Sequence, residues 1–187
     1  MKAGTVAGSA HPRGRRLRIT CDARRDQVGD AGGIYALSTD DATATAPPLA
    51  GTTVMDGTLN VPPATTTPVM GIAGAAYTNN DLDPDTATTL FDLDTAADQV
   101  SVQSPATGGA LAPTGKLLVD AGPVAGFDIY SRTGLGTTRG NRGFATISVL
   151  GRHSFYQVDL LTGSLSRIGS FRPAAQVVDI AIPLDQG

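Results

Sequence analysis

Two twelve-residue segments of this chain, residues 90–101 and 155–166, align with one another without a gap. Each places an aromatic and an aliphatic residue two positions apart, then an aspartate, a short turn-forming stretch and a second apolar run. Residues that alternate with a period of two lie on one face of a β-strand. The pattern therefore predicts a β-hairpin in each segment, and a fainter copy over residues 34–45 predicts a third.

Further strands are expected around these hairpins. Apolar runs precede the two clear hairpins and follow them, at residues 71–77, 143–149, 124–130 and 177–182. Repeats of three or four short strands at this spacing are typical of propeller blades with loop insertions. We therefore predict an all-β fold, a partial β-propeller or propeller-like array of antiparallel strand repeats with about two and a half blades. A jelly roll or sandwich is the alternative, because its short strands are spaced in a similar way.

The composition agrees with this fold class, because the strong helix formers are scarce. All 17 acidic residues are aspartates, the only lysines are Lys2 and Lys116, and the chain holds 23 glycines and 12 prolines. Such a mixture favours turns between short strands. No apolar run approaches the roughly 20 residues that a membrane-spanning helix needs, so no membrane span is predicted.

The positive charge is concentrated at the start of the chain. Residues 1–25 hold seven of the fourteen basic residues and a single acid, Asp22. We expect residues 1–15 to form a disordered basic arm and residues 16–187 to form the β-repeat domain. No aromatic side chains are interleaved with the arginines, so a solvated arm is favoured over a nucleic-acid partner.

Five short motifs, taken in order, resemble the bacterial family known as domain of unknown function DUF4394. The resemblance covers about residues 16–182, and its motifs are DGTLN at 56–60, AAYTNN at 75–80, TTLFDLD at 88–94, GFDI at 126–129 and DLLTG at 159–163. It implies a propeller-like repeat domain, often exported, with no established activity. The family usually carries further repeats ahead of residue 16, which predicts an N-terminally truncated chain whose open strand edges favour self-association. The resemblance predicts an extracellular or envelope location, whereas the chain shows no signal peptide, so the cytoplasm stays open as the alternative.

The candidate metal site is an acidic loop. Asp81, Asp83 and Asp85 recur at every second position, and hard carboxylate oxygens at such spacing can converge on Ca²⁺. Pro84 stiffens this loop and Thr86 stands where a calcium loop has glycine, so an acidic hairpin loop without metal is the favoured interpretation. Calcium is the one cofactor candidate. Cys21 with His11 and His153 cannot form a Cys/His zinc site, because four such ligands are needed.

Catalytic groups are few. His153 and Ser154 are adjacent in a predicted strand and point to opposite faces, so they cannot act as base and nucleophile. Four aspartates stand at repeated positions, which favours a role in turns; they are Asp94, Asp128, Asp159 and Asp179. The leading hypothesis is a non-enzymatic binding or scaffold domain of the bacterial envelope or exterior. The alternatives are a propeller-type hydrolase, lactonase- or glycosidase-like, that uses metal and aspartates, and a truncated fragment without independent function.

Overall fold

A computed structural model of the chain describes residues 18–21, 33–38, 53–79, 87–106, 108–134 and 137–182. In these ranges the chain forms strands and turns and no helix, which confirms the all-β prediction. The described part therefore contains no helix that could span a membrane. The strands are β1 (Arg18–Cys21), β2 (Gly33–Ser38), β3 (Thr53–Thr58), β4 (Asn60–Val61), β5 (Ala64–Pro68), β6 (Ile72–Tyr77), β7 (Leu90–Asp94), β8 (Gln99–Gln103), β9 (Leu111–Lys116), β10 (Ala125–Gly134), β11 (Thr137–Val149), β12 (Arg152–Val158) and β13 (Leu165–Ser170).

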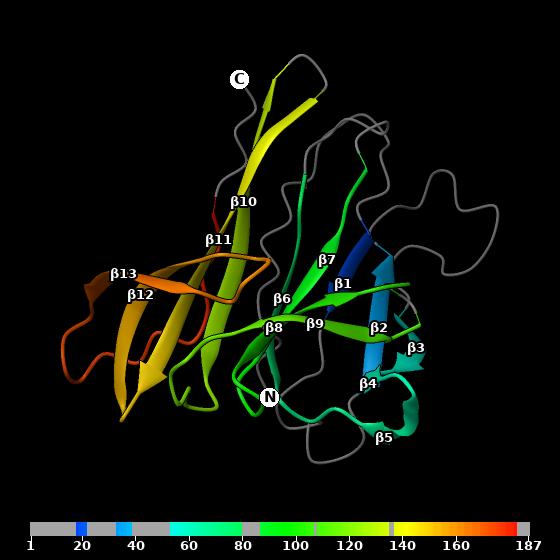
Figure 1. The fold of residues 1–187 in the computed structure, drawn as a ribbon, viewed down its shortest axis with the longest axis horizontal. Coiled ribbons are helices and arrows are strands. Elements are labelled where there is room, and N and C mark those ends of the chain that lie inside the picture. Colours follow the sequence, from blue (N-terminus) through cyan, green and yellow to red (C-terminus); the bar gives the residue numbers. More distant parts are fainter. Residues whose placement is uncertain are drawn as a thin grey trace.

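The strands form four sheets in which every pairing between strands is antiparallel (Figure 1). The N-terminal sheet has the order β1-β2-β3, and β4 pairs with β5. The central sheet has the order β6-β7-β8-β9 and the C-terminal sheet has the order β10-β11-β12-β13. Within each sheet the strands follow the order of the sequence, so each large sheet is a simple meander.

The two clear hairpins are present, and the fainter third one, at residues 34–45, lies partly outside the described residues. Residues 90–101 fall on β7 and β8, and residues 155–166 fall on β12 and β13. Their places in the sheets differ, however, since β7 and β8 are the second and third strands of their sheet whereas β12 and β13 are the third and fourth. The sequence match therefore identifies two similar hairpins whose positions in the strand order of their sheets differ by one strand.

One local prediction is wrong. Residues 177–182 form no strand in the structure, because no neighbouring strand in the described part of the chain pairs with them. The connection between the first two strands of the C-terminal sheet is short, because β10 extends to Gly134 and β11 begins at Thr137. The pairing of Arg132 with Gly140 and of Tyr130 with Arg142 extends the hairpin toward this connection.

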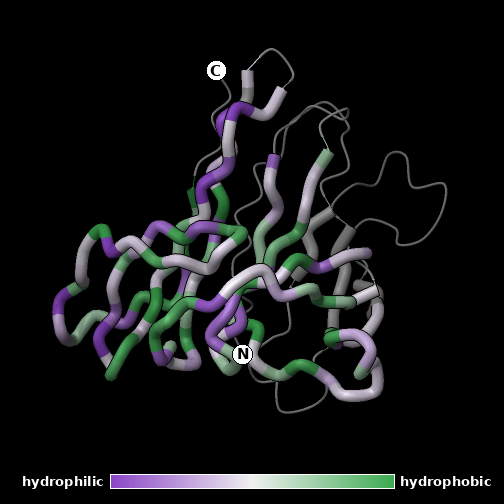
Figure 2. The backbone as a smooth tube through the Cα atoms, in the orientation of Figure 1, coloured by the Kyte–Doolittle hydropathy of each residue, from purple (hydrophilic) through white to green (hydrophobic). Residues whose placement is uncertain are grey.

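The main core lies between the central and C-terminal sheets. Leu93 and Val100 from the central sheet and Ala145 and Ile147 from the C-terminal sheet are completely buried in one apolar cluster. Along β10, β11 and β12 apolar residues alternate with polar ones, which Figure 2 shows as changing colours along each tube. This period of two gives the C-terminal sheet one face toward the core, here called its near face, and an opposite face, here called its far face.

A turn of the C-terminal sheet fixes the central sheet against it. The Thr114 hydroxyl on β9 donates a hydrogen bond of 2.7 Å to the carbonyl of Leu160, in the turn between β12 and β13. At Gly115 the β9 backbone touches the carbonyl of Thr162 so closely that a Cβ atom has no room. Gly163 follows with a φ of +71°, a conformation that glycine adopts at little cost. The two sheets therefore hold a fixed relative position.

Candidate functional site

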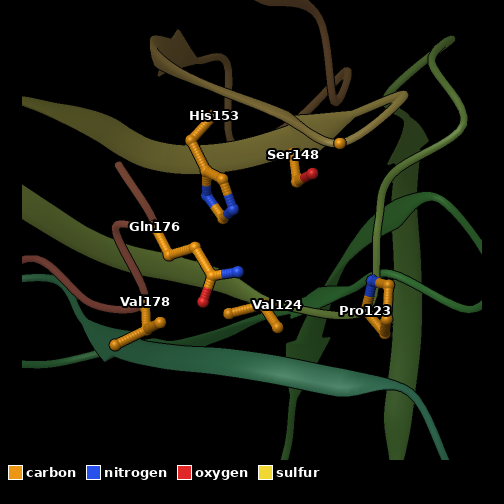
Figure 3. Close-up of a pocket in the computed structure, with 7 residues that line it drawn as sticks. Pro123, Val124, Ser148, His153, Gln176 and Val178 are labelled. Atoms are coloured by element: carbon orange, nitrogen blue, oxygen red, sulfur yellow. The ribbon is translucent and has the colours of Figure 1, made fainter. Parts of the chain in front are cut away.

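Two hollows open at the same end of the central and C-terminal sheets. The first has a volume of about 280 Å³ and is lined by Met70, Gly71, Ile72, Thr95, Ala96, Ala121 and Pro123. The second has a volume of about 220 Å³ and is lined by Pro123, Val124, Ser148, Gly151, His153, Gln176 and Val178 (Figure 3). Pro123 lines both hollows, so they are neighbours along one rim.

The two hollows occupy matching places in the two sheets. Each is lined by the residues at the start of a first strand, which is β6 for one hollow and β10 for the other. Each also includes residues from the end of the second strand, β7 or β11, or from the turn after it, and residues that lead into the next extended segment. The sheets therefore repeat one arrangement at this rim, and β6 corresponds to β10.

The second hollow contains most of the polar side chains. Antiparallel pairing places Ser148 of β11 directly opposite His153 of β12, and both residues are buried. In Figure 3 the imidazole of His153 and the side chain of Ser148 approach the same space from above, and Gln176 enters it from the segment below. The Nδ1 atom of His153 is buried and has no hydrogen-bond partner among the described residues. The rest of the lining is Pro123, Val124, Gly151 and Val178, which carry no polar side chain.

The turn between β11 and β12 explains why the sequence does not reveal this pair. Leu150 and Gly151 both have positive φ angles, 49° and 76°, and form a two-residue hairpin turn between the paired residues Val149 and Arg152. Leucine is a rare residue in such a conformation, so Leu150 itself gives no turn signal. Without the turn the register of the hairpin is unknown, and Ser148 cannot be matched to His153. Gly151 is the one signal that sequence reasoning could have used.

His153 and Ser154 behave as predicted for adjacent strand residues. The Ser154 hydroxyl lies 3.0 Å from the hydroxyl of Ser170 on the outer strand β13, away from the imidazole that faces the hollow. Ser154 therefore has a hydrogen bond that ties two strands together. This arrangement holds a strand pair and offers no activated nucleophile.

Asp94 and Asp159 cap turns, as the sequence predicts. The Oδ1 atom of Asp94 accepts hydrogen bonds of 2.9 Å from the amides of Ala96 and Ala97. The Oδ1 atom of Asp159 accepts bonds of 3.0 and 2.9 Å from Leu161 and Thr162, which lower the pKa of this carboxyl below its usual value. Each aspartate therefore caps its own turn, and the two turns belong to different sheets.

Asp128 and Asp179 are brought close together instead. Burial raises the pKa of Asp128, hydrogen bonds from the amides of Ile182 and Ile129 lower it, and the negative charge of Asp179 raises it again, with a net increase. The amide of Ile182 donates to Oδ2 at 2.6 Å and that of Ile129 to Oδ1 at 2.8 Å. Both oxygens of Asp128 are therefore engaged by backbone.

The predicted calcium ligands Asp81, Asp83 and Asp85 lie outside the described residues, so calcium at this loop stays a prediction. The basic arm at 1–15, with His11, also lies outside them. Within the described ranges no group of three or more His, Cys, Asp or Glu side chains is placed to hold a metal ion.

Comparison with known proteins gives one match. The model of a family described as a domain of unknown function (DUF4394) matches residues 36–181, which is most of the chain. No curated protein and no solved structure matches.

Proposed function

This chain belongs to the DUF4394 family, and from that premise we propose that it is a non-enzymatic binding or scaffold domain of the bacterial envelope or exterior. The envelope or exterior location rests on the resemblance to exported family members. The domain presents its ligand site on one rim of a propeller-like array, where the loops between sheets meet. The repeated placement of the two hollows supports such an array.

The lining of the hollows carries this proposal. Val124, Val178 and Pro123 supply apolar surface beside the polar groups of His153, Ser148 and Gln176. Binding sites commonly combine an apolar wall with a few polar groups that orient the ligand. A neutral ligand with hydroxyl or amide groups along an apolar face fits this lining, because its polar side chains are a hydroxyl, an amide and an imidazole and it holds no Asp, Glu, Lys or Arg.

The state of the aspartates favours binding over hydrolysis. A hydrolase needs carboxylates that can reach substrate or metal, and a glycosidase needs two of them on either side of the reacting bond. Asp94 and Asp159 accept bonds from their own turns, and both oxygens of Asp128 accept backbone amides. The one observation in favour of the hydrolase is the closeness of Asp128 and Asp179, which raises the pKa of Asp128.

Single-tryptophan reporters test the rim. The chain has no tryptophan, so Pro123→Trp places the only indole between the two hollows, and Leu161→Trp places it on the exposed turn after β12 as a matched control. The probes are neutral disaccharides to tetrasaccharides and end-capped tripeptides. We expect at least one probe class to shift the emission of Pro123→Trp in a saturable way and to leave Leu161→Trp unchanged.

Two outcomes would contradict the proposal. If no neutral probe changes the emission of Pro123→Trp, or if both reporters respond equally, the rim is not the binding site. Turnover of chromogenic glycosides or lactones that disappears in Asp128→Asn and Asp179→Asn would establish the hydrolase instead. Calcium added to the unmodified chain forms a separate arm, in which a higher melting temperature would support a site at Asp81, Asp83 and Asp85.

A further inference from the structure

Three extended segments lie side by side through the middle of the molecule. β6 packs against β10, and residues 177–182 pack against the other side of β10 (Figure 1). Both contacts are made at a glycine. A Cβ atom on Gly74 of β6 would lie 2.8 Å from Cβ of Phe127, and one on Gly126 of β10 would lie 2.6 Å from Cα of Asp179. Residues 177–182 therefore occupy the same position relative to β10 as β10 occupies relative to β6.

Residues 177–182 are held at both ends. The hydroxyl of Thr146, which is completely buried, accepts the amide of Gly126 at 2.9 Å and lies 3.4 Å from the carbonyl of Val177, to which it donates. At the other end the amide of Ile182 donates to Asp128. The segment is thus placed by hydrogen bonds from β10 and β11 although it belongs to neither sheet.

The segment has the composition of an interior strand. Four of the six residues in the run Val-Val-Asp-Ile-Ala-Ile are β-branched and aliphatic, a composition that favours strands. β6 and β10 each pair with a following strand, whereas no strand in the described ranges pairs with 177–182. Val178 is consequently 59% exposed. Residues 177–182 have the position of a first strand, and no described strand follows them as β7 follows β6 and β11 follows β10.

Among the described strands, the N-terminal sheet has no counterpart of β6 or β10. The central and C-terminal sheets each have four strands and begin with the inner strand β6 or β10, whereas the N-terminal sheet has three. Among the described strands β1 has a neighbour on one side only, which is β2. A first strand added beside β1 would give this sheet the same four-stranded order. An unpaired strand edge is a template for such an addition.

The far face of the C-terminal sheet carries aromatic surface against which a further sheet can pack. Phe144 and Phe155 both lie on this face with rings stacked at 5.7 Å, and both stay partly exposed. Residues 177–182 cross the same face at Thr146. In Figure 1 this segment and β1 lie on opposite sides of β6 and β10, so one chain carries the two complementary features at its two ends.

We infer that residues 177–182 of one copy pair antiparallel with β1 of a second copy, so that the partner's N-terminal sheet packs on the far face of the C-terminal sheet. The same contact made in return closes two chains into a ring. The three large sheets described in each chain give a ring of about six sheets for two copies, within the range of about four to eight blades that closed propellers have. One chain closing on itself through its described sheets would give only three. Head-to-tail contacts of this kind form rings when the rotation closes.

The mass of the full chain in solution, across a dilution series, is the first test. We expect a species of two chains. Successive backbone amides of a strand point to opposite sides. The double variant Val178→Pro/Ala181→Pro removes one amide on each side of the segment, so at least one of the two belongs to the proposed pairing. It should shift the mass to one chain. Val178→Thr/Ala181→Thr keeps both amides and should stay a dimer, and circular dichroism checks that the sheets of all variants are intact.

Disulfide trapping is the second test, and it does not depend on the proline variants folding. Cys21 is the last residue of β1 and the chain's only cysteine. Single cysteines at positions 178, 179, 180 and 181 scan both faces of the segment, and a disulfide needs Cα atoms about 4.4–6.8 Å apart. We expect one or two positions to give a covalent dimer under mild oxidation, and the same variants with Cys21→Ser to give none.

Each contrary outcome overturns the inference. A monomer at all concentrations, a dimer that survives the proline pair, or the absence of any cross-link would show that β1 and 177–182 do not meet between copies. A disulfide within one chain would show that the chain's own segment reaches β1. The ligand proposal is tested separately, since it is judged by the response of Pro123→Trp to added probe at one fixed protein concentration, whereas this inference is judged by mass and cross-linking without probe.

Discussion

The two four-stranded sheets differ in how completely the faces turned away from their shared core are covered. In the central sheet the side chains on this face, from Leu90 and Asp92 on β7 to Ser101 and Gln103 on β8, are all buried. On the corresponding outward face of the C-terminal sheet, which is turned away from the shared core, Thr146 is buried, but Phe155 is partly exposed and Gln157 is exposed. The central sheet is therefore enclosed on both faces, whereas the C-terminal sheet ends the described array with one face open. The stacked rings of Phe144 and Phe155 lie on this open face, where the contact with a second copy is inferred.

The largest expected effect comes from truncating an apolar residue in each sheet. Leu90→Ala removes a side chain that is 2% exposed in the enclosed sheet, and we expect a loss of about 2–5 kcal/mol in the free energy of unfolding. Ile168→Ala on the outer strand β13, where the side chain is 56% exposed, should change it by less than about 0.5 kcal/mol. Urea unfolding of both variants measures the difference, and equal losses would show that β13 is as enclosed as β7.

The contact between the sheets should give the next largest effect. Gly115→Ala drives a Cβ atom into the backbone of Thr162, so we expect a loss of about 1–3 kcal/mol. Gly169→Ala on β13 is the matched control, because nothing lies within 4 Å of its Cβ position, and it should change stability by less than about 0.5 kcal/mol. Thermal unfolding compares the two. A neutral Gly115→Ala would mean that the turn at 159–163 does not rest on β9.

The two turn aspartates provide a smaller contrast. Asp94 is buried, so Asp94→Ala leaves two turn amides without an acceptor and should cost about 1–3 kcal/mol. Asp159 is exposed, and water can replace it at the amides of Leu161 and Thr162, so Asp159→Ala should cost less than about 1 kcal/mol. Chemical unfolding of the two variants tests the order, and a reversed order would contradict the burial of the first turn.

The smallest expected effect is a difference in titration. The pKa of Asp128 is raised in the folded chain, so its contribution to stability is complete below about pH 3.9 and is lost as the pH rises through the folded pKa. The pKa of Asp159 is lowered, so its contribution is present above about pH 3.9 and is lost as the pH falls through the folded pKa. Carbon-detected NMR of the carboxyl groups should show the two midpoints on opposite sides of the unfolded value. Asp179→Asn should lower the midpoint of Asp128 and leave that of Asp159 unchanged.

The sequence predicts local features of this fold better than their positions in the sheets. The fold class, the two hairpins and the capping roles of Asp94 and Asp159 follow from alternation and from turn chemistry, which act within a few residues. The offset of the hairpins by one strand could not be predicted, because it depends on which strands pair across the sheet. The pairing of Ser148 with His153 depends on a turn at Leu150, which itself gives no turn signal.

The segment at 177–182 shows a further reason for such failures. Its residues have the composition of a strand, and the strand prediction is wrong for the described chain because a strand needs a neighbour to accept its hydrogen bonds. A local pattern reports a preference, whereas pairing is a property of the assembly. If the inferred contact with a second copy is correct, the pattern predicts the assembled state.

Hydrogen exchange of the amides at 177–182 tests most directly the claim that the array continues beyond the C-terminal sheet. The structure of one chain gives this segment no strand partner, so in an isolated chain most of its amides would exchange about as fast as those at 171–175. We predict instead that 177–182 and β1 are protected together at high protein concentration and lose that protection together on dilution. Fast exchange at 177–182 at every concentration would contradict the account.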